Sequence, residues 1–296
     1  MLISVPNVSE GADRRVIEAV GAAFAPARVL DVHSDPDHGR TVYTLAAEQG
    51  TLAGALVAGA REALDRIDVS GHGGIHPFVG ALDVAPVVYL EPERRGAAAA
   101  EAFTAAALLG DELELPVFLY GDLATHPSRR ERAALREGGP ARLADRISSG
   151  DLVPDFGPAR LDPRRGAALV AARPPLVAFN VDLESDDLEL ARSIAADLRE
   201  SSGGLPGVRA IGLYLPARGR AQVSTNVHDH LAVPLAEIVE RVSERARVAE
   251  AELVGLAPAA AFAGFPEGVP LRDFDPARNL IENALGSLAT DGPDQA

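Results

Sequence analysis

The pattern of apolar and polar positions predicts one order of elements in the first third of the chain. We expect a strand at residues 2–5 and a helix from about residue 11 to 24, capped by the polar residues 7–10. Strands at 28–34 and 40–47 follow, then a helix at 51–67, where apolar residues recur every three or four positions, and a strand at 81–90. An alanine-rich helix at about 93–112 and a short strand at 116–121 come next. The order up to residue 90 is βαββαβ.

The second half repeats this order. The expected strands are 175–183, 208–215, 221–227 and 251–258, the helices are 188–200 and 231–249, and a closing helix spans 276–288. The words VPNVSEG (5–11) and AFNVDLESD (178–186) also resemble one another. We therefore predict an α+β fold of two duplicated, ferredoxin-like βαββαβ subdomains, 1–173 and 174–296, with a ligand cleft between them.

Residues 122–173 interrupt the repeat and are assigned to the first subdomain. They hold HPSRRERAALREGGPARL (126–143), which predicts a short helix with arginines on one face, and the proline- and glycine-rich PDFGPARLDPRRG (154–166). A long excursion of this kind is typical of either a functional loop or a linker. From composition alone, the linker is the simpler interpretation of 154–166.

Composition narrows the possible chemistry. The 296 residues carry a formal net charge of −15, which disfavours nucleic acid and anionic membranes as partners. Cysteine and lysine are both absent, so the 28 basic residues are all arginine, which excludes thiolate chemistry, Schiff bases and a P-loop lysine. No signal peptide and no run of 18 apolar residues is visible, so a cytoplasmic protein is expected.

The stretch GHGGIHPFVGALDV (71–84) places two histidines four residues apart. Its glycines and Pro77 disfavour a helix, so the segment is predicted to be a loop that leads into a strand. A metal site would need a third ligand that nothing in the pattern specifies, and we expect no metal. A histidine that transfers a proton suits His76 better, whereas the simplest alternative is a histidine that hydrogen-bonds its own loop.

Two more polar clusters are candidates for binding. HSDPDHGRTVYT (33–44) joins two strands and contains Arg40, whose guanidinium suits a carboxylate, although polar residues are common in any turn. AQVSTNVHDH (221–230) places amides and hydroxyls on a strand, and Asn180 occupies the corresponding first strand of that half. These side chains either line the cleft or face water.

Seven of these motifs occur together in an order that resembles the glutamate formimidoyltransferases, the transferase part of the formimidoyltransferase-cyclodeaminases. They are VPNVSEG (5–11), DVHSDPDHGRTVYT (31–44), GGIHPFVGALDVAP (73–86), LYG (119–121), PDFGP (154–158), AFNVDL (178–183) and AQVSTN (221–226). The resemblance covers residues 2 to about 285. It implies a homodimer that binds tetrahydrofolate between its subdomains and moves a formimino group between N-formimino-L-glutamate and N5 of tetrahydrofolate, in histidine breakdown.

The resemblance also implies roles for residues. His76 matches the catalytic histidine of the family, and residues 157–166 match its folate-binding segment, which overturns the linker interpretation. That segment comprises Gly157, Pro158, Ala159, Arg160, Leu161, Asp162, Pro163, Arg164, Arg165 and Gly166. The expected substrate-binding residues are Arg40, His33, Asp35, His72 and Asn180, and Arg40, Arg160 and Arg164 are the expected carboxylate partners.

Two positions depart from the family pattern. Phe78 stands where a basic residue is frequent, and Gly39 stands where an asparagine is frequent. These departures leave two alternatives open, a paralogue that moves a formyl or formimino group to or from another amine, and a folate-binding protein without activity. The cyclodeaminase part has no counterpart in this sequence.

Overall fold

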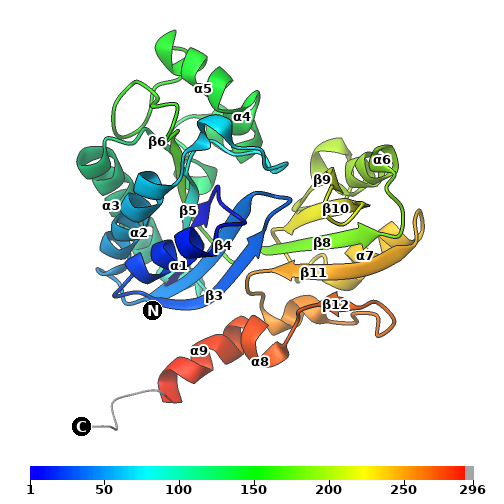
Figure 1. Cartoon of the computed structure of the whole chain (residues 1–296). Coiled ribbons are helices and arrows are strands. Elements are labelled where there is room, and N and C mark those ends of the chain that lie inside the picture. Colours follow the sequence, from blue (N-terminus) through cyan, green and yellow to red (C-terminus); the bar gives the residue numbers. More distant parts are fainter. Residues whose placement is uncertain (291–296) are drawn as a thin grey trace. The chain divides into compact units, whose positions relative to one another are not determined.

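The computed structural model describes residues 1–290, so the last six residues of the predicted second subdomain lie outside the described part of the chain. The protein is a mixed α/β protein with two sheets, and it divides into two compact units. We call Met1–Pro174 the N-terminal unit and Pro175–Ala296 the C-terminal unit. Figure 1 traces both units along the chain. No helix within residues 1–290 is both long and apolar enough to cross a membrane.

The N-terminal unit contains one seven-stranded sheet. Its strands are β1 (Leu2–Ser4), β2 (Asn7–Val8), β3 (Arg28–Asp35), β4 (Arg40–Ala47), β5 (Leu82–Val88), β6 (Val117–Leu119) and β7 (Ala168–Arg173). Its α-helices are α1 (Arg14–Ala23), α2 (Leu52–Arg66), α3 (Arg95–Leu113), α4 (Arg132–Arg136) and α5 (Gly139–Ser148), and its 3-10 helices are η1 (Val69–Gly71), η2 (Pro92–Arg94), η3 (Gly121–Leu123) and η4 (Pro127–Arg129). β3 pairs with β4 at one edge of the sheet. Both β1 and β2 lie between β4 and β5, and all of these pairs are antiparallel. β7 and β6 then extend the sheet in parallel beyond β5.

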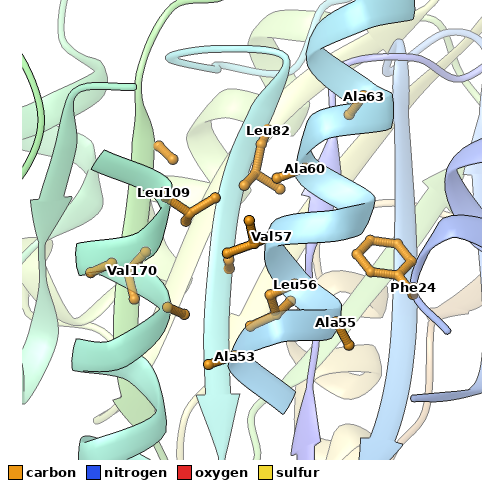
Figure 2. Packing of buried hydrophobic residues seen from close by; sticks show 14 of the residues in the cluster. Phe24, Ala53, Ala55, Leu56, Val57, Ala60, Ala63, Leu82, Leu109 and Val170 are labelled. Atoms are coloured by element: carbon orange, nitrogen blue, oxygen red, sulfur yellow. The ribbon is translucent and has the colours of Figure 1, made fainter. Parts of the chain in front are cut away.

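Apolar residues fill both faces of this sheet. On one face, Leu56 and Ala60 of α2, Leu109 of α3 and Leu82 of β5 form a fully buried cluster (Figure 2). The alanine-rich character of α2 and α3 suits this packing, because small side chains let the helices lie close to the sheet. On the other face, apolar residues of α4 and α5 cover β5, β6 and β7. The excursion thus contributes a second helical layer to the unit.

Three expectations for the N-terminal unit were inaccurate. α1 begins after Asp13, whose Oδ1 accepts hydrogen bonds from the backbone N–H groups of Arg15 and Val16, and Asn7 belongs to β2 rather than to a cap. The arginine-rich helix is two helices, because Gly138 adopts a left-handed backbone conformation (φ 75°) between α4 and α5. Residues 168–173, read as part of a loop, form the buried strand β7, whose sequence ALVAAR lacks the polar alternation that marks a half-exposed strand.

The C-terminal unit contains a five-stranded sheet. Its strands are β8 (Val177–Leu183), β9 (Val208–Leu215), β10 (Arg220–Val227), β11 (Val248–Val254) and β12 (Leu271–Arg272), and its α-helices are α6 (Leu188–Leu198), α7 (Leu235–Ser243), α8 (Pro276–Asn279) and α9 (Ile281–Thr290). Its 3-10 helices are η5 (Glu200–Ser202) and η6 (Ala259–Phe262). The strand order is β12-β11-β8-β10-β9, with every pair antiparallel except β11 with β12. The buried Val181 of β8, Ile194 of α6 and Ile238 of α7 belong to its core.

The predicted closing helix 276–288 is interrupted. Leu280 is extended (φ −89°, ψ 130°) between α8 and α9, and the backbone on either side of it bonds to Ala257. The N–H of Ala257 donates to the carbonyl of Asn279 at 3.1 Å, and the N–H of Ile281 donates to the carbonyl of Ala257 at 3.0 Å. This bridge replaces one turn of helix and fastens the segment to the end of β11.

Candidate active site

His76 lies in the loop between η1 and β5, and the end of the excursion holds that loop at both sides. Upstream, the N–H of Val69 donates to the carbonyl of Arg164 at 2.9 Å. Downstream, the N–H of Ala81 donates to the carbonyl of Arg165 at 2.8 Å. Gly166 is left-handed (φ 73°), and a Cβ added there would lie 2.2 Å from the carbonyl oxygen of Val79, so only glycine permits this approach. The segment 157–166 therefore ends against the histidine loop.

The ring of His76 contacts Arg40, which belongs to a buried ion pair. The Nη1 of Arg40 lies 3.2 Å from Nδ1 of His76 and 2.7 Å from Oδ2 of Asp83. The Nε of Arg40 donates to Oδ1 of Asn7 at 2.9 Å. The Asp83 side chain is fully buried, and it also accepts from the guanidinium of Arg136 and, at 2.9 Å, from the N–H of Val79. The predicted pair of His76 and Arg40 is thus brought together, and Asp83 fixes its geometry.

The shorter contacts of these two side chains indicate the tautomer of His76. Nδ1 lies 2.8 Å from the carbonyl oxygen of Pro77, and Nη1 of Arg40 lies closer to Asp83 than to His76. With the hydrogen on Nδ1, His76 donates to the carbonyl of Pro77, Nη1 of Arg40 donates to Asp83 rather than to the ring, and the lone pair lies on Nε2. Burial, together with the positive charges of Arg40 and Arg136, holds the pKa of His76 well below its ordinary 6.5. Burial and these charges therefore favour the neutral imidazole of His76, with an unprotonated Nε2.

The other histidines and the acidic residue of the turn surround this centre. The ring of His38 stacks on that of His76, with centroids 5.9 Å apart, and Oδ1 of Asp35 accepts from the N–H of His38 at 2.9 Å. Burial lowers the pKa of His72 as well. His33 is partly buried on β3, opposite Val42 of β4. Thus Asp35 bonds to the backbone of His38, and a role in binding for Asp35, His72 or His33 stays a prediction.

Packing explains both departures from the family pattern. Gly39 is left-handed (φ 62°), a conformation that asparagine also tolerates, but a Cβ there would lie 2.7 Å from Cε1 of His72. The ring of Phe78 meets His72 edge-on at 4.6 Å and packs against the apolar core of the N-terminal unit. Both residues therefore serve the placement of His72.

The arginines of the segment 157–166 lie at its outer side. Arg160 is exposed. Arg164 is exposed and pairs through Nε with Oδ2 of Asp68 at 2.9 Å. Arg165 is half-exposed, with Nη2 3.8 Å from Oδ1 of Asp65. The remaining residues of the segment are glycines, prolines and small or apolar residues, with Asp162 capping the turn before Gly166. None of these arginines is buried beside His76, so their roles stay predictions.

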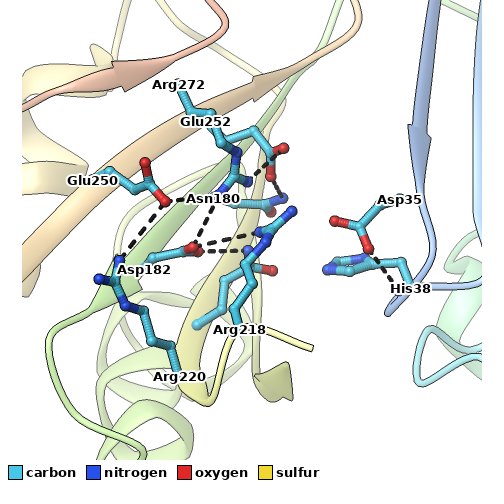
Figure 3. Close-up of polar contacts among 10 residues, drawn as sticks. Asp35, His38, Asn180, Asp182, Arg218, Arg220, Glu250, Glu252 and Arg272 are labelled. Carbon is cyan, nitrogen blue, oxygen red and sulfur yellow. Dashed lines mark hydrogen bonds and ion pairs between the residues drawn. The ribbon is translucent and has the colours of Figure 1, made fainter. Parts of the chain in front are cut away.

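Asn180 belongs to a polar face of the sheet in the C-terminal unit (Figure 3). In register across β8, β10 and β11, Asn180 is opposite Glu252, and Asp182 is opposite Gln222, so these side chains share one face. The amide of Asn180 donates to Glu252 at 3.0 Å, and that of Gln222 donates to Asp182 at 2.7 Å. A binding role for Asn180 is an untested prediction, but its surroundings are polar and buried.

Arg272 of β12 is at the centre of this polar face. Its guanidinium lies 2.6 Å from Glu252, 2.9 Å from Glu250 and 3.2 Å from Asp182. Burial alone lowers the pKa of Arg272, but these carboxylates outweigh burial and raise it above its ordinary value. Arg218 also contacts Asp182 and Arg220 contacts Glu250, so three arginines meet three carboxylates on this face.

Comparison with known proteins decides the family. A model of the N-terminal subdomain of the formiminotransferase domain matches residues 1–173, and a model of the formiminotransferase domain matches residues 178–265. The chain belongs to the formiminotransferase family. This confirms the resemblance seen in the seven motifs.

Two relatives have nearly the same length as this formiminotransferase-family chain. The glutamate formimidoyltransferase of Streptococcus pyogenes serotype M1 is 34% identical over 290 residues, which are 95% of this chain and 97% of that protein. The glutamate formimidoyltransferase of Thermoplasma acidophilum is 33% identical over 296 residues, 96% and 97% of the two chains. The formimidoyltransferase-cyclodeaminase of Mus musculus is 36% identical over 315 residues, and this chain spans 57% of its length.

Sequence reasoning missed several residues of the site in this formiminotransferase-family protein. They are Asn7, Asp83 and Arg136, which contact Arg40 or share its carboxylate. The arginine-bearing helix was predicted, but no part in the site was given to its Arg136. The polar face of the C-terminal unit, with Asp182, Glu250, Glu252 and Arg272, was not predicted either. Within residues 1–290, no group of three or more histidines and carboxylates is placed to hold a metal ion.

Proposed function

We propose that this protein transfers a formimino group between N-formimino-L-glutamate and N5 of tetrahydrofolate, as the names of its relatives indicate. The observation that supports this most is the environment of His76, which is partly buried beside Arg40 and is favoured in its neutral form by that burial and by the nearby positive charges. A transfer between two nitrogens needs one group that accepts and returns a proton, and a neutral imidazole is suited to both steps.

His76 would act twice in the reaction. N5 of tetrahydrofolate attacks the amidine carbon and a tetrahedral adduct forms, while Nε2 of His76 accepts the proton that N5 loses. The adduct then collapses, the bond from carbon to the glutamate nitrogen breaks, and the imidazolium of His76 donates its proton to that nitrogen. Because the resting pKa of His76 is low, its imidazolium is a strong acid and returns the proton readily.

We further propose that residues 157–166 contact the folate. This is supported by the backbone bonds of Arg164 and Arg165 to the two sides of the histidine loop. The substrate-binding roles of Arg40, His33, Asp35, His72 and Asn180 are part of the same proposal. Arg40 is the best placed of them, since it contacts His76 directly and its Nη2 is buried without a hydrogen-bond partner among residues 1–290.

The strand orders support the proposal of two duplicated ferredoxin-like subdomains. In the N-terminal unit the order is β3, β4, β1 with β2, and β5, and in the C-terminal unit it is β9, β10, β8 and β11, which is the same path in both. We propose that the protein binds tetrahydrofolate, that the active form is a homodimer, and that it acts in the cytoplasm. These three points depend on the family resemblance.

A substrate panel tests the proposal. Purified protein is incubated with tetrahydrofolate and, separately, N-formimino-L-glutamate, N-formyl-L-glutamate and formimino derivatives of glycine and aspartate, and the product folate is quantified. The proposal expects the highest kcat/KM with N-formimino-L-glutamate. Preference for the formyl donor or for another amine would support the paralogue, and folate binding without turnover of any donor would support a protein without activity.

A further inference from the structure

The helix α4 brings two arginines into the neighbourhood of the His76 site, where a third arrives from β7. The guanidinium of Arg136 pairs with Asp83, the residue that also holds Arg40. The guanidinium of Arg132 lies over the ring of Tyr120, 5.7 Å from its centroid. Arg173, the last residue of β7, is close enough to Tyr120 and Arg132 for their charges to act on it. Together with Arg40, these three arginines form one cluster of four in the N-terminal unit.

Positive charge in this cluster exceeds negative charge. Asp83, which is fully buried, acts on Arg40, Arg132 and Arg136, and the exposed Glu131 acts on Arg132. Burial lowers the pKa of Arg132, and it lowers the pKa of Arg173 to about 10. Like charges held together away from water are costly, so a protein keeps them where an anion neutralises them.

The hydrogen-bonding capacity of the cluster is also incomplete. Among residues 1–290, no partner is found for three buried donors, Nη2 of Arg40, Nε of Arg136 and Nε of Arg173. The guanidinium of Arg132 lies over the ring of Tyr120, and this cation–π contact does not occupy its N–H groups as hydrogen-bond donors. Buried donors without partners are rare in proteins, and here several of them come from one cluster.

We propose that Arg132 and Arg173 form an anion subsite that takes a glutamyl carboxylate, with Arg136 and Arg40 beside it. This assignment rests on the proposed function, and it moves the carboxylate contact from the exposed Arg160 and Arg164 to the cluster beside His76. The carboxylate comes either from the amino-acid substrate or from the glutamyl tail of tetrahydrofolate. In both cases it brings negative charge close to Arg40 and Arg136, whose charges lower the pKa of His76.

The test compares Arg132→Gln and Arg173→Gln with Arg142→Gln in the full chain. Arg142 of α5 lies 3.5 Å from Glu137, and both side chains are exposed, so this control changes net charge equally without touching the cluster. Dissociation constants are measured for L-glutamate, tetrahydrofolate and tetrahydropteroate, which lacks the glutamyl group. We expect the affinity for one glutamyl ligand to fall about 10- to 100-fold in each cluster variant, the usual effect of losing a charged hydrogen bond. Arg142→Gln should bind like wild type.

The three ligands identify the source of the carboxylate. Weaker binding of glutamate assigns the subsite to the amino acid, whereas loss of the preference for tetrahydrofolate over tetrahydropteroate assigns it to the folate tail. Unliganded Arg132→Gln should melt at or above the wild-type temperature, since it removes excess positive charge, whereas a purely structural arginine would lower that temperature. The inference is overturned if both cluster variants bind glutamate and tetrahydrofolate within twofold of wild type.

Failure of the inference is distinguishable from failure of the proposed function. If wild type transfers the formimino group and the cluster variants do so with unchanged KM, the function stands and the subsite is wrong. If wild type binds glutamate, the variants do not, and no donor is turned over, the subsite stands and the function is wrong. If wild type binds neither glutamyl ligand, both are wrong.

Discussion

Replacing Asp83 by asparagine removes a fully buried carboxylate that holds two arginines of the His76 site. The asparagine oxygen still accepts from the N–H of Val79, which lies 2.9 Å from Oδ1 of Asp83. In wild type, Oδ2 of Asp83 lies 2.7 Å from Nη1 of Arg40 and also contacts Arg136. In the variant, the uncharged side-chain NH2 group of asparagine occupies this position and donates hydrogen bonds instead of accepting them. Two guanidiniums with side-chain exposures of 8% and 10% lose their common partner.

The expected cost follows from this burial. Removing one partner from a buried ion pair typically costs about 3–5 kcal/mol, because the remaining charge stays out of water without compensation. For a domain of this size, 1 kcal/mol corresponds to about 2–4 °C of melting temperature, so we expect a loss of roughly 6–20 °C. The pKa of Asp83 is lowered, since the arginines outweigh burial, so its contribution is present above the unfolded pKa of 3.8 and is lost as pH falls below it.

Calorimetry and denaturant titration of wild type, Asp83→Asn and Asp122→Asn at pH 7 measure this difference. Asp122 pairs with Arg95 at 3.0 Å, but both side chains are more than half exposed, so the control should stay within about 0.5 kcal/mol of wild type. A loss of less than about 1 kcal/mol in Asp83→Asn would show that the arginines are solvated and that the buried cluster has been misread.

Three further predictions concern other parts of the molecule. The folded-state pKa of His76 is depressed, so wild type should lose stability relative to His76→Gln as pH falls below 6.5, by up to about 1.4 kcal/mol per pH unit. Denaturant titrations at several pH values measure this loss, and the same pH dependence of unfolding free energy in both proteins would contradict the prediction. Gly39→Asn should cost about 1–3 kcal/mol in the same titration, because its Cβ would lie 2.7 Å from Cε1 of His72 and 2.8 Å from the Cα of Gly74. A His72→Ala background should remove the part of this cost that comes from the imidazole, and an equal cost in both backgrounds would refute the clash with His72. Arg272→Gln should destabilise the C-terminal unit by about 3–5 kcal/mol. The control Arg220→Gln should cost less than about 1 kcal/mol, because Arg220 lies 3.8 Å from Glu250 and is more exposed. Similar losses of stability by calorimetry in both variants would show that burial of Arg272 is unimportant.

The sequence predicted most of the elements because their signals are local. The strands at 28–34, 40–47 and 208–215 and the helix at 51–67 match β3, β4, β9 and α2 within a residue or two at each end. Hairpins and amphipathic helices carry their own periodicity, and the positions of these elements depend little on distant contacts. β7 was missed because it pairs in parallel with strands about 50 and 85 residues away, and its alanines show no alternation.

The candidate site was predicted only in part for the same reason. His76 and Arg40 were identified through motifs, and the structure brings them to 3.2 Å. The roles of Asp83 and Arg136 follow from burial and from pairing between segments 53 residues apart, which no local pattern specifies. Arg164 was expected to meet a carboxylate of the ligand; in the structure it pairs with Asp68 at the surface, and its role stays a prediction.

The measurement that tests the central claim most directly is transfer by His76→Ala compared with wild type, with tetrahydrofolate binding measured on the same samples. General acid–base catalysis contributes about 10²- to 10⁴-fold, so kcat should fall by that factor while folate binds within a few-fold of wild type. A His76→Ala protein that retains wild-type kcat with N-formimino-L-glutamate would contradict the account.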